Sequence, residues 1–264
     1  MKLGFIGCGN MASAMISGIV SNGMIAANQI IGADVSEISR EKVQRNCGIQ
    51  IAESNREVVT QADIVVLSVK PQFYEDVIAE IKDSVSGQQI VVTLAPGKTL
   101  KWLEEKFGKP VKIIRTMPNT PAMVQEGMTA ICPNSYVMKE ETDVVIGLLK
   151  GFSEVEVVPE KLMDAVVAVS GSSPAYVFMM IEAMADAAVA EGMPRTQAYK
   201  FAAKAVMGSA KMVLETGKHP GELKDMVCSP GGTTIAAVQV LEETGFRSAL
   251  IKAMEACAEK SREL

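Results

Sequence analysis

Two glycines directly after a strand-like run constrain the fold of this chain most strongly. Lys2–Ile6 is a predicted strand, Asn10–Ser21 is a predicted helix, and the turn between them reads Gly-x-Gly-x-x-Ala. In this pattern the first glycine permits a tight turn, the second lets the backbone meet a pyrophosphate, and the alanine lets helix and strand pack closely. We therefore expect a Rossmann turn that binds a dinucleotide through Ile6, Gly7, Cys8, Gly9, Asn10, Met11 and Ala12.

The second predicted strand, Ile30–Ala33, is followed by Asp34, about twenty residues after the turn, where an acidic residue holds an adenosine ribose. A carboxylate there suits a ribose 2′-hydroxyl and repels a 2′-phosphate, whereas Ser36 and Arg40 just beyond it suit a phosphate. The expected cofactor is therefore NADH or NADPH, with a slight preference for NADH. The alternative for Asp34 is a turn residue that ends the strand.

Further cofactor contacts are expected where other strands end, because ligands of open α/β sheets bind at that edge. Asn55, at the start of a predicted helix, is expected on the adenosine side, or else as the cap of that helix. Lys70 is expected in the site, with a solvated loop charge as the alternative. The contacts at strand ends are Val69, Lys70, Pro71 and Gln72 at the end of Ile64–Val69, and Ala95 and Gly97 after Ile90–Leu94.

The first 159 residues alternate short β-branched runs with helical segments, which predicts a mostly parallel sheet covered by helices. Continuous apolar runs such as Ile64-Val65-Val66-Leu67 suit strands that are buried on both faces. The fold class is therefore α/β, with residues 1–159 as a Rossmann NAD(P)-binding domain. Further predicted strands are Val111–Arg115, Met128–Ile131 and Val155–Val158, and further helices are Arg40–Asn46, Asn55–Gln61, Phe73–Ile81 and Leu100–Phe107.

From about Glu160 the strand signal stops, and residues 160–264 are predicted to form an all-helical domain. Ser173-Pro174 has the residues of a helix N-cap and first turn, so a helix is expected from there to about Glu191. This helix is apolar almost all round and must be buried, by a second subunit rather than by its own chain alone. Further helices are expected at Gln197–Glu215, after Pro220, and from Thr234 with a break near Gly245.

Charge and cysteine content exclude several kinds of partner. The net charge is −5 and no basic run occurs, so we expect neither nucleic acid nor a membrane as partner. The cysteines Cys8, Cys47, Cys132, Cys228 and Cys257 include no closely spaced pair, so neither disulfides nor a metal site is indicated. Reduced, mostly buried thiols in a cytoplasmic protein are expected.

One stretch of the helical half, Ser229-Pro230-Gly231-Gly232-Thr233-Thr234, contains more glycines and hydroxyl groups than the single N-cap that a helix start needs. Adjacent glycines let a backbone approach a ligand closely, and free N–H groups before a helix bind anions. The sole histidine, His219, precedes a proline at a helix start, so a surface or capping role is expected. His219 is therefore not expected to act as an acid–base catalyst. A hydride transfer to a cyclic imine that is already protonated needs no acid–base residue, since positioning and charge contribute most of the catalysis.

Three motifs resemble the pyrroline-5-carboxylate reductase family: Ser170-Gly171-Ser172-Ser173-Pro174-Ala175-Tyr176, Met117-Pro118-Asn119-Thr120-Pro121, and His219-Pro220-Gly221 leading to Ser229–Thr234. The resemblance extends over the whole chain, to Phe246-Arg247. It implies the last step of proline synthesis, the reduction of Δ1-pyrroline-5-carboxylate to L-proline with NADPH or NADH. It also implies a Rossmann domain followed by a helical substrate-binding and dimerisation domain, in a homodimer or a higher homo-oligomer.

The resemblance also implies roles for site residues. Thr234 stands where the family's proposed proton donor to the ring nitrogen stands; because an unperturbed threonine is a poor acid, we interpret it as an orienting hydrogen bond or a relay through water. Ser173 is the second expected catalytic residue and also a helix cap, and Asn119 is an expected cofactor contact. Met226 replaces an asparagine of some members. The expected substrate contacts are Ser172, Ser229, Gly231, Gly232, Thr233 and Thr234.

Two other classes share part of this pattern. The β-hydroxyacid dehydrogenases also join a similar glycine turn to a helical domain, and they rely on a lysine there, for which Lys204 or Lys211 would be the candidate. A nucleotide-sensing protein without catalysis would keep the phosphate turn but would not need the loop Ser229–Thr234.

Overall fold

The computed structural model describes residues 1–94 and 96–263. These residues form two compact units, which are described separately. The Rossmann unit comprises Met1–Ser172 together with the chain from Cys257 onward, and the helical unit comprises Ser173–Ala256. The domain boundary predicted between residues 159 and 160 stays a prediction.

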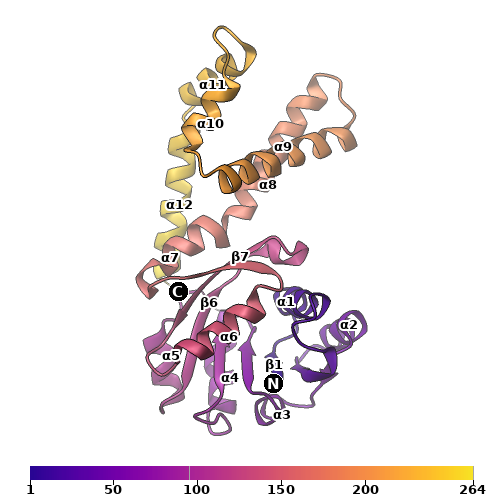
Figure 1. Ribbon diagram of the computed structural model, residues 1–264, viewed down its shortest axis with the longest axis vertical. Coiled ribbons are helices and arrows are strands. Elements are labelled where there is room, and N and C mark those ends of the chain that lie inside the picture. The colour runs from indigo at the N-terminus through magenta and orange to yellow at the C-terminus, as the bar shows by residue number, and fades with distance from the viewer. Residues whose placement is uncertain (95, 264) are drawn as a thin grey trace. The chain divides into compact units, whose positions relative to one another are not determined.

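The Rossmann unit is built on one sheet, seen in the lower part of Figure 1. The sheet has eight strands in the order β3-β2-β1-β4-β5-β6-β7-β8. All neighbouring strands of the described chain are parallel except β6 and β7, which are antiparallel. The order 3-2-1-4-5-6 is that of dinucleotide-binding folds, so the predicted Rossmann architecture is confirmed. The strands are β1 Leu3–Ile6, β2 Ile30–Ala33, β3 Gln50–Ile51, β4 Ile64–Leu67, β5 Ile90–Thr93, β6 Lys112–Met117, β7 Gly127–Pro133 and β8 Ser153–Val157.

Side-chain hydroxyl groups cap several of the helix starts in this unit. Ser36, Ser54 and Thr99 accept hydrogen bonds from the backbone N–H groups three residues later. The cap of α3 is therefore Ser54, and the alternative role of Asn55 as a cap is wrong; Asn55 is the first residue of α3. The helices are α1 Asn10–Ser21, α2 Glu37–Cys47, α3 Asn55–Gln61, α4 Tyr74–Ile81, α5 Leu100–Phe107 and α6 Lys139–Leu149.

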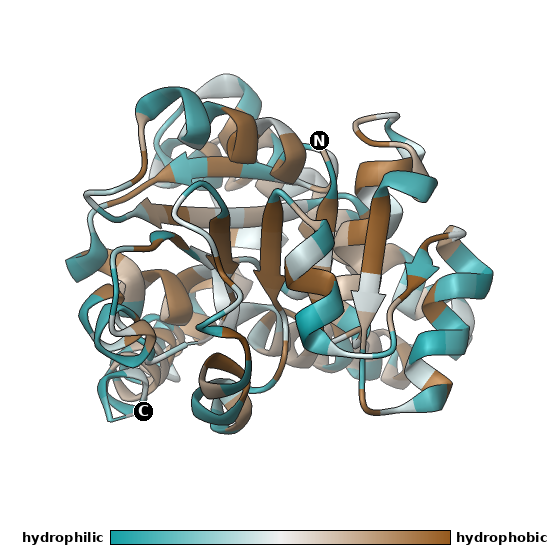
Figure 2. Cartoon of the chain, turned by 90° about the horizontal axis from the view of Figure 1, so that it is seen from below, coloured by the Kyte–Doolittle hydropathy of each residue, from teal (hydrophilic) through white to brown (hydrophobic). Residues whose placement is uncertain are grey.

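Side chains alternate between two apolar layers, one on each face of the sheet. Along β4, Ile64 and Val66 belong to one layer, while Val65 and Leu67 belong to the other. All four are buried, and the strands form the brown centre of the sheet in Figure 2. Burial on both faces explains why these strands are continuous apolar runs.

A helical stretch that the sequence did not predict precedes Ser173. It consists of a 3₁₀ turn Glu160–Leu162, α7 Met163–Val166 and a π turn Val167–Gly171. Ser172 has a right-handed helical backbone, with φ −99° and ψ −25°, so Ser173 does not begin a helix after an extended residue. Ser173 is itself the first residue of α8 and not the residue before the helix, so its predicted capping role is wrong.

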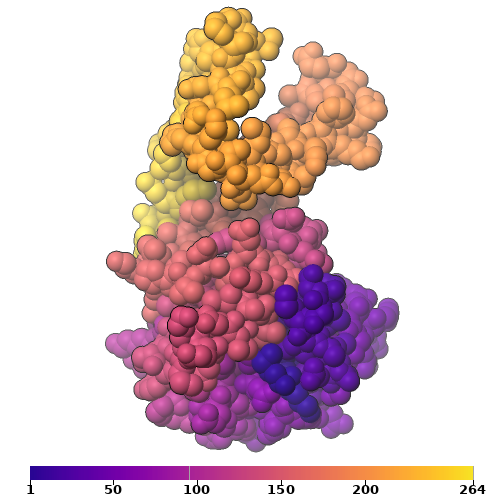
Figure 3. Space-filling model, viewed as in Figure 1, coloured from indigo at the N-terminus to yellow at the C-terminus, as the bar shows by residue number. Residues whose placement is uncertain are grey.

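The helical unit contains α8 Ser173–Ala190, α9 Arg195–Thr216, α10 Pro220–Val227, α11 Thr233–Glu243 and the first part of α12 Phe246–Arg262. The helix at Thr234 and the break at Gly245 are confirmed. Helices α8 and α9 pack side by side, whereas open space separates their far end from α10 and α11 in the space-filling view (Figure 3).

The helical unit has almost no core of its own. Within Ser173–Ala256, all of which is described, the buried residues are Ala185, Ala198 and Ala202. On α8, Phe178 is 63% exposed and Met179 is 68% exposed. By length and composition, the stretch Glu160–Ala190 also meets the criteria of a membrane-crossing helix. So much uncovered apolar surface requires a partner for the helical unit.

Candidate active site

The glycine turn between β1 and α1 has the shape that a dinucleotide requires. Gly7 has φ +96°, and a Cβ there would lie 2.9 Å from the backbone of Ser68 and Val69. A Cβ on Gly9 would meet no atom within 4 Å. Gly9 is the N-cap of α1 and provides no side-chain cap, so the first N–H groups of the helix face an open approach. The turn therefore fits the pyrophosphate of a nicotinamide dinucleotide.

Asp34 braces this turn from the end of β2. Its Oδ2 accepts a hydrogen bond from the Cys8 backbone N–H at 2.7 Å, and its Oδ1 accepts one from the Ser36 N–H at 2.8 Å. The Arg40 guanidinium donates from Nη1 to the Asp34 carbonyl oxygen at 2.5 Å. A carboxylate oxygen has two lone pairs, so a ribose contact is compatible with this bracing and stays a prediction. The turn role considered for Asp34 is present in the structure.

Cys8 contributes backbone to the turn while its side chain is buried. The thiol lies 3.6 Å from the carbonyl oxygen of Ala33 and packs over Gly32. Burial raises the pKa of Cys8 to about 12, and the Asp34 carboxylate adds to the shift, while Arg40 partly opposes it. Cys8 therefore stays a neutral thiol and has no nucleophilic role at neutral pH.

A cavity of about 270 Å³ lies at the carboxyl ends of β1, β4, β5 and β6. It brings together four predicted cofactor residues, Met11, Val69, Lys70 and Asn119, at the sheet edge where Rossmann folds bind ligands. Its other lining residues are Ser68, Leu94, Met117, Pro118, Thr120 and Gly171.

The remaining predicted cofactor residues do not line this cavity. Asn55 lies on α3, and its Nδ2 donates to Glu80 Oε2 at 2.8 Å. Ser36 caps α2, and Pro71 and Gln72 belong to a 3₁₀ turn after Lys70. Gly97, with φ +75°, lies in a turn after β5, and Ala95 is outside the described residues. Cofactor contacts by these residues stay predictions.

The sequence did not indicate two side chains that shape the cavity. Tyr74 is fully buried; its hydroxyl donates to the Leu67 carbonyl at 2.5 Å and accepts from the Leu94 N–H at 2.9 Å, which ties β4 to β5 at the site. Ser68 Oγ donates to the Gly7 carbonyl at 2.6 Å and so connects the glycine turn to β4. The sequence did not predict the roles of these two side chains because their hydrogen-bond partners are set by the pairing of strands.

Asn119 joins the cavity to the π turn. Its Nδ2 donates to the Ser170 carbonyl at 3.1 Å, and its Oδ1 accepts from the Met128 N–H at 2.9 Å. The side chain is 9% exposed. Gly171 lies so close to Met117 that a Cβ there would be 2.8 Å from the Met117 Cε. A π turn commonly marks a functional position in a helix, and here it brings Gly171 into the cavity wall.

The loop Ser229–Thr234 of the helical unit forms a tight turn that opens α11. The Gly232 N–H donates to the Ser229 carbonyl at 3.0 Å, and Gly231 has φ +66°. A Cβ on Gly232 would collide with Ser229 Oγ. Gly232 is an N-cap without a side-chain cap, so the first N–H groups of α11 are available to an anion. Thr233 is exposed and Thr234 is half-buried.

Two of the side chains considered for other chemistry, those of His219 and Lys211, have structural partners. His219 is the N-cap of α10, and its Nδ1 accepts from the Gly221 N–H at 3.0 Å, which confirms the predicted capping role. Lys211 pairs with Glu215 at 3.3 Å on the exposed face of α9.

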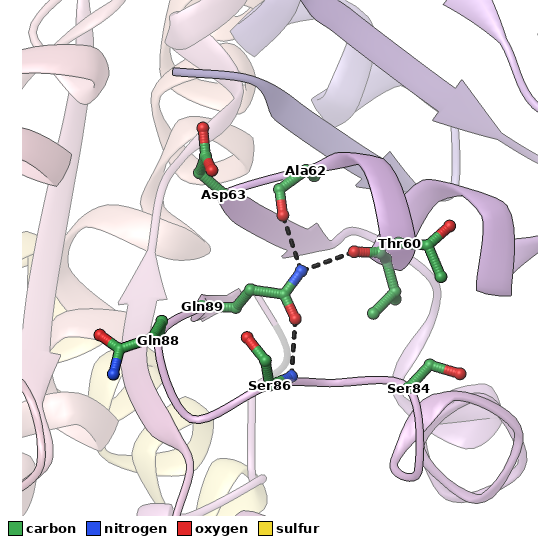
Figure 4. A pocket seen from close by; sticks show the side chains of 8 residues that line it. Thr60, Ala62, Asp63, Ser84, Ser86, Gln88 and Gln89 are labelled. Carbon is green, nitrogen blue, oxygen red and sulfur yellow. Dashed lines mark hydrogen bonds between the residues drawn. The ribbon is translucent and has the colours of Figure 1, made fainter.

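A larger hollow, of about 410 Å³, lies at the opposite edge of the sheet (Figure 4). Gln89 spans it: Nε2 donates to the carbonyls of Val59 and Ala62, and Oε1 accepts from the Ser86 N–H at 2.7 Å. These bonds tie the start of β5 to α3 and the segment after it. Because ligands of open α/β sheets bind at the other edge, we assign this hollow a structural role.

Comparison with known proteins decides the family. Residues 160–264 match the family model described as pyrroline-5-carboxylate reductase dimerisation, and residues 2–97 match the model described as NADP oxidoreductase, coenzyme F420-dependent. The pyrroline-5-carboxylate reductase of Escherichia coli is 55% identical over 263 residues, which cover 100% of this chain and 98% of the relative. The chain belongs to the pyrroline-5-carboxylate reductase family.

Solved pyrroline-5-carboxylate reductases have the same fold. The structure from Coxiella burnetii is 35% identical, with a TM-score of 0.91 over 99% of this chain and 97% of that one. The Plasmodium falciparum structure, which has NADP bound, is 32% identical, with a TM-score of 0.92 over 100% and 97%. The predicted fold class, a Rossmann domain followed by a helical dimerisation domain, is confirmed, and the two rival classes are set aside.

Proposed function

We propose that this chain reduces Δ1-pyrroline-5-carboxylate to L-proline with the nicotinamide at the cavity of the Rossmann unit and the substrate carboxylate at the start of α11. The chain is an oxidoreductase of proline biosynthesis, as the reaction of its family requires. The observation that carries this assignment is the 55% identity to a pyrroline-5-carboxylate reductase over the full chain.

The cofactor proposal depends on the open turn at Gly9 and on the uncapped start of α1. N–H groups from Gly9 to Ala12, at the start of α1, would hold the pyrophosphate, and Asp34 with Ser36 would hold the adenosine end. Bound NADPH or NADH supplies the hydride that reduces the imine carbon. The Arg40 charge beside the Asp34 carbonyl favours a 2′-phosphate and the Asp34 carboxylate opposes it, so we propose that both cofactors are used.

The substrate proposal depends on the loop before α11. Its backbone N–H groups and the positive end of the helix dipole favour a carboxylate, with Ser229, Gly231, Gly232 and Thr233 around it. The Thr234 hydroxyl would orient the ring nitrogen, and Ser172 and Ser173 would contact the substrate near the nicotinamide.

The protein supplies position and charge more than acid–base chemistry. The ring nitrogen of the imine arrives protonated, so its carbon is already electrophilic. His219 is engaged as a helix cap, and the Cys8 thiol is kept neutral by its raised pKa. Thr234 therefore serves as a hydrogen-bonding group, directly or through water.

We further propose a homodimer, or a higher oligomer built from dimers, in which the helical units interlock. The matched dimerisation model covers this part of the chain, and the exposed apolar side chains of α8 need a cover. A second copy, rather than a membrane, would cover the apolar surface of Glu160–Ala190, which contains Asp164, Glu182 and Asp186. The chain would then work in the cytoplasm, with a small-molecule substrate and no nucleic-acid partner.

The reaction is tested by mixing the chain with pyrroline-5-carboxylate and either NADPH or NADH. The absorbance of the reduced nicotinamide is followed, and L-proline is measured as the product. Turnover with proline formed in equal amount to cofactor oxidised supports the proposal. No oxidation of either cofactor would overturn it, and the ratio of the two kcat/KM values measures cofactor preference.

A further inference from the structure

The end of α12 is held against the helical stretch Glu160–Gly171 and Ser172 by two side-chain hydrogen bonds, both within the Rossmann unit. Ser261 Oγ donates to Asp164 Oδ1 at 2.6 Å, and Ser261 is 2% exposed. One turn earlier on α12, the Cys257 thiol donates to Ser172 Oγ at 3.2 Å. The two segments therefore run antiparallel, and the later residue of α12 contacts the earlier residue of the stretch.

Ser172 is also held from its backbone. Its N–H donates to the Val167 carbonyl at 2.8 Å and closes the π turn. Two residues earlier, the Asn119 amide holds the carbonyl of Ser170 from the cavity side. A π turn is a rare backbone arrangement that persists only where its surroundings support it. Two attachments, from α12 and from the π turn, thus meet on Ser172, and Asn119 holds the same π turn at Ser170.

The direction of the thiol hydrogen bond matters for the chemistry of Ser172. A hydroxyl has one proton to donate and two lone pairs to accept with. When the Cys257 thiol occupies one lone pair, the proton of Ser172 stays available for an acceptor on a ligand. The acceptor oxygens in the proposed reaction are those of the substrate carboxylate and the nicotinamide carboxamide.

We propose that Cys257 is a positioning residue, which orients the Ser172 hydroxyl as a donor toward an acceptor oxygen of the substrate, with Ser261 and Asp164 anchoring the end of α12. This inference rests on the proposed substrate contact of Ser172. Cys257 reaches the reaction only through Ser172, so its loss affects substrate affinity more than cofactor affinity.

The kinetic test compares Cys257→Val, which keeps the volume and removes the donor, with Cys257→Ser, which keeps a donor. Cys47→Val is the matched control, since Cys47 is buried in the Rossmann core at the end of α2. We expect Cys257→Val to raise KM for pyrroline-5-carboxylate about three- to tenfold, the effect of one hydrogen bond. Cys257→Ser should recover most of this loss. The Kd for NADPH, from fluorescence titration, should change in neither variant.

Equal KM values for Cys257→Val and the wild-type chain would overturn the proposal, as would equal losses in Cys257→Val and Cys257→Ser. The Cys47→Val control should leave KM unchanged, and a rise there would mean that KM responds to core packing in general. If Ser172→Ala leaves KM unchanged in an active enzyme, the positioning role is also refuted, while the reaction itself stands.

A second readout needs no activity and separates this proposal from the proposed function. In a double-mutant cycle on urea unfolding, Cys257→Val and Ser172→Ala should each lower the unfolding midpoint, and the double variant should fall no further than the more affected single variant. Additive losses would refute the contact even in an active enzyme. Non-additive losses in a chain without turnover would support the contact while the proposed function fails.

Discussion

At the residue scale, the role proposed for Thr234 depends on the backbone around it. It lies half-buried in the first turn of α11, after a Gly232 that provides no side-chain cap. It therefore belongs to an uncapped first turn, whose backbone N–H groups favour an anionic ligand. A threonine in the middle of a helix would have no such neighbours.

We expect Thr234→Ala to lower kcat about tenfold, because one orienting hydrogen bond to the ring nitrogen is lost. The Kd for NADPH should stay unchanged, since the cofactor turn lies on α1. Steady-state kinetics and fluorescence titration measure the two quantities. Thr216→Ala is the control, because its hydroxyl bonds only to backbone around the end of α9: it donates to the Met212 carbonyl at 2.7 Å and accepts from the Lys218 N–H at 3.3 Å. An unchanged kcat in Thr234→Ala would remove this residue from the mechanism.

Gly7 and Gly147 form a second pair for a test at this scale. Gly7→Ala places a Cβ against the backbone of Ser68 and Val69 at φ +96°, so the free energy of unfolding should fall by about 3 kcal/mol. Gly147 lies inside α6, where an added Cβ meets no atom within 4 Å. Gly147→Ala should raise that free energy by about 0.5 to 1 kcal/mol. Urea denaturation measures both changes, and equal effects would contradict this description of the turn.

Residue types predicted the glycine turn and the histidine cap but not the partners of Asp34. The glycine turn is a local feature of the backbone, so residues close together in the sequence are enough to predict it. Asp34, in contrast, bonds to Cys8, which is 26 residues away in the chain. Tyr74 likewise bonds to the ends of two strands. Such contacts follow from strand pairing, and a single sequence does not show pairing.

At the scale of the element, α6 is anchored to the sheet by an ion pair. Glu141 accepts from the Met138 N–H as part of a capping box and pairs with Lys112 of β6. Burial raises the pKa of Glu141, but the Lys112 hydrogen bond, the Met138 N–H and the Lys112 charge together outweigh it, so the pKa lies below its ordinary value. The ionised form is therefore favoured by folding.

We expect Glu141→Gln to lower the free energy of unfolding by about 1 kcal/mol at neutral pH. Since the folded pKa is below the unfolded one, the stabilising effect is complete above the unfolded pKa and is lost as pH falls through the folded pKa. Urea denaturation of both chains at a series of pH values measures the difference. A difference that persists or grows in acid would contradict the pairing.

Helix bounds were predictable where a glycine turn or a capping side chain marks the start of the helix. The helices Asn10–Ser21, Asn55–Gln61 and Leu100–Phe107 have the bounds that the sequence predicted. The strand β3 has only two residues, too few for a periodic signal, and α6 was missed because its polar first turn resembles a loop. The stretch before Ser173 was missed because Ser173-Pro174 has the residue types of a helix start. There the π turn continues the helical backbone to the serine.

At the scale of the whole molecule, the main feature is the exposed apolar surface of the helical unit, which one chain alone does not bury. Three alanines are its buried residues, so helix propensity and a partner must stabilise it. The all-round apolar character of α8 predicts this need from the sequence alone. A single sequence does not specify which residues of the partner cover it.

Sedimentation at micromolar concentration should therefore give at least twice the mass of one chain. Phe178→Glu places a charge on the exposed face of α8 and should shift the population toward monomer with loss of turnover. Lys211→Gln, on an exposed ion pair of α9, serves as the control and should sediment like the wild-type chain. A wild-type monomer with full activity would contradict the interlocked helical units.

The central claim is that the loop Ser229–Thr234 and the start of α11 bind the substrate carboxylate. The most direct test compares kcat/KM for Δ1-pyrroline-5-carboxylate with that for 1-pyrroline, the same ring without the carboxylate. Two charge-assisted hydrogen bonds predict a preference of about a hundredfold or more for the carboxylated ring. Equal efficiencies for the two imines would show that the carboxylate is not bound and would contradict the account.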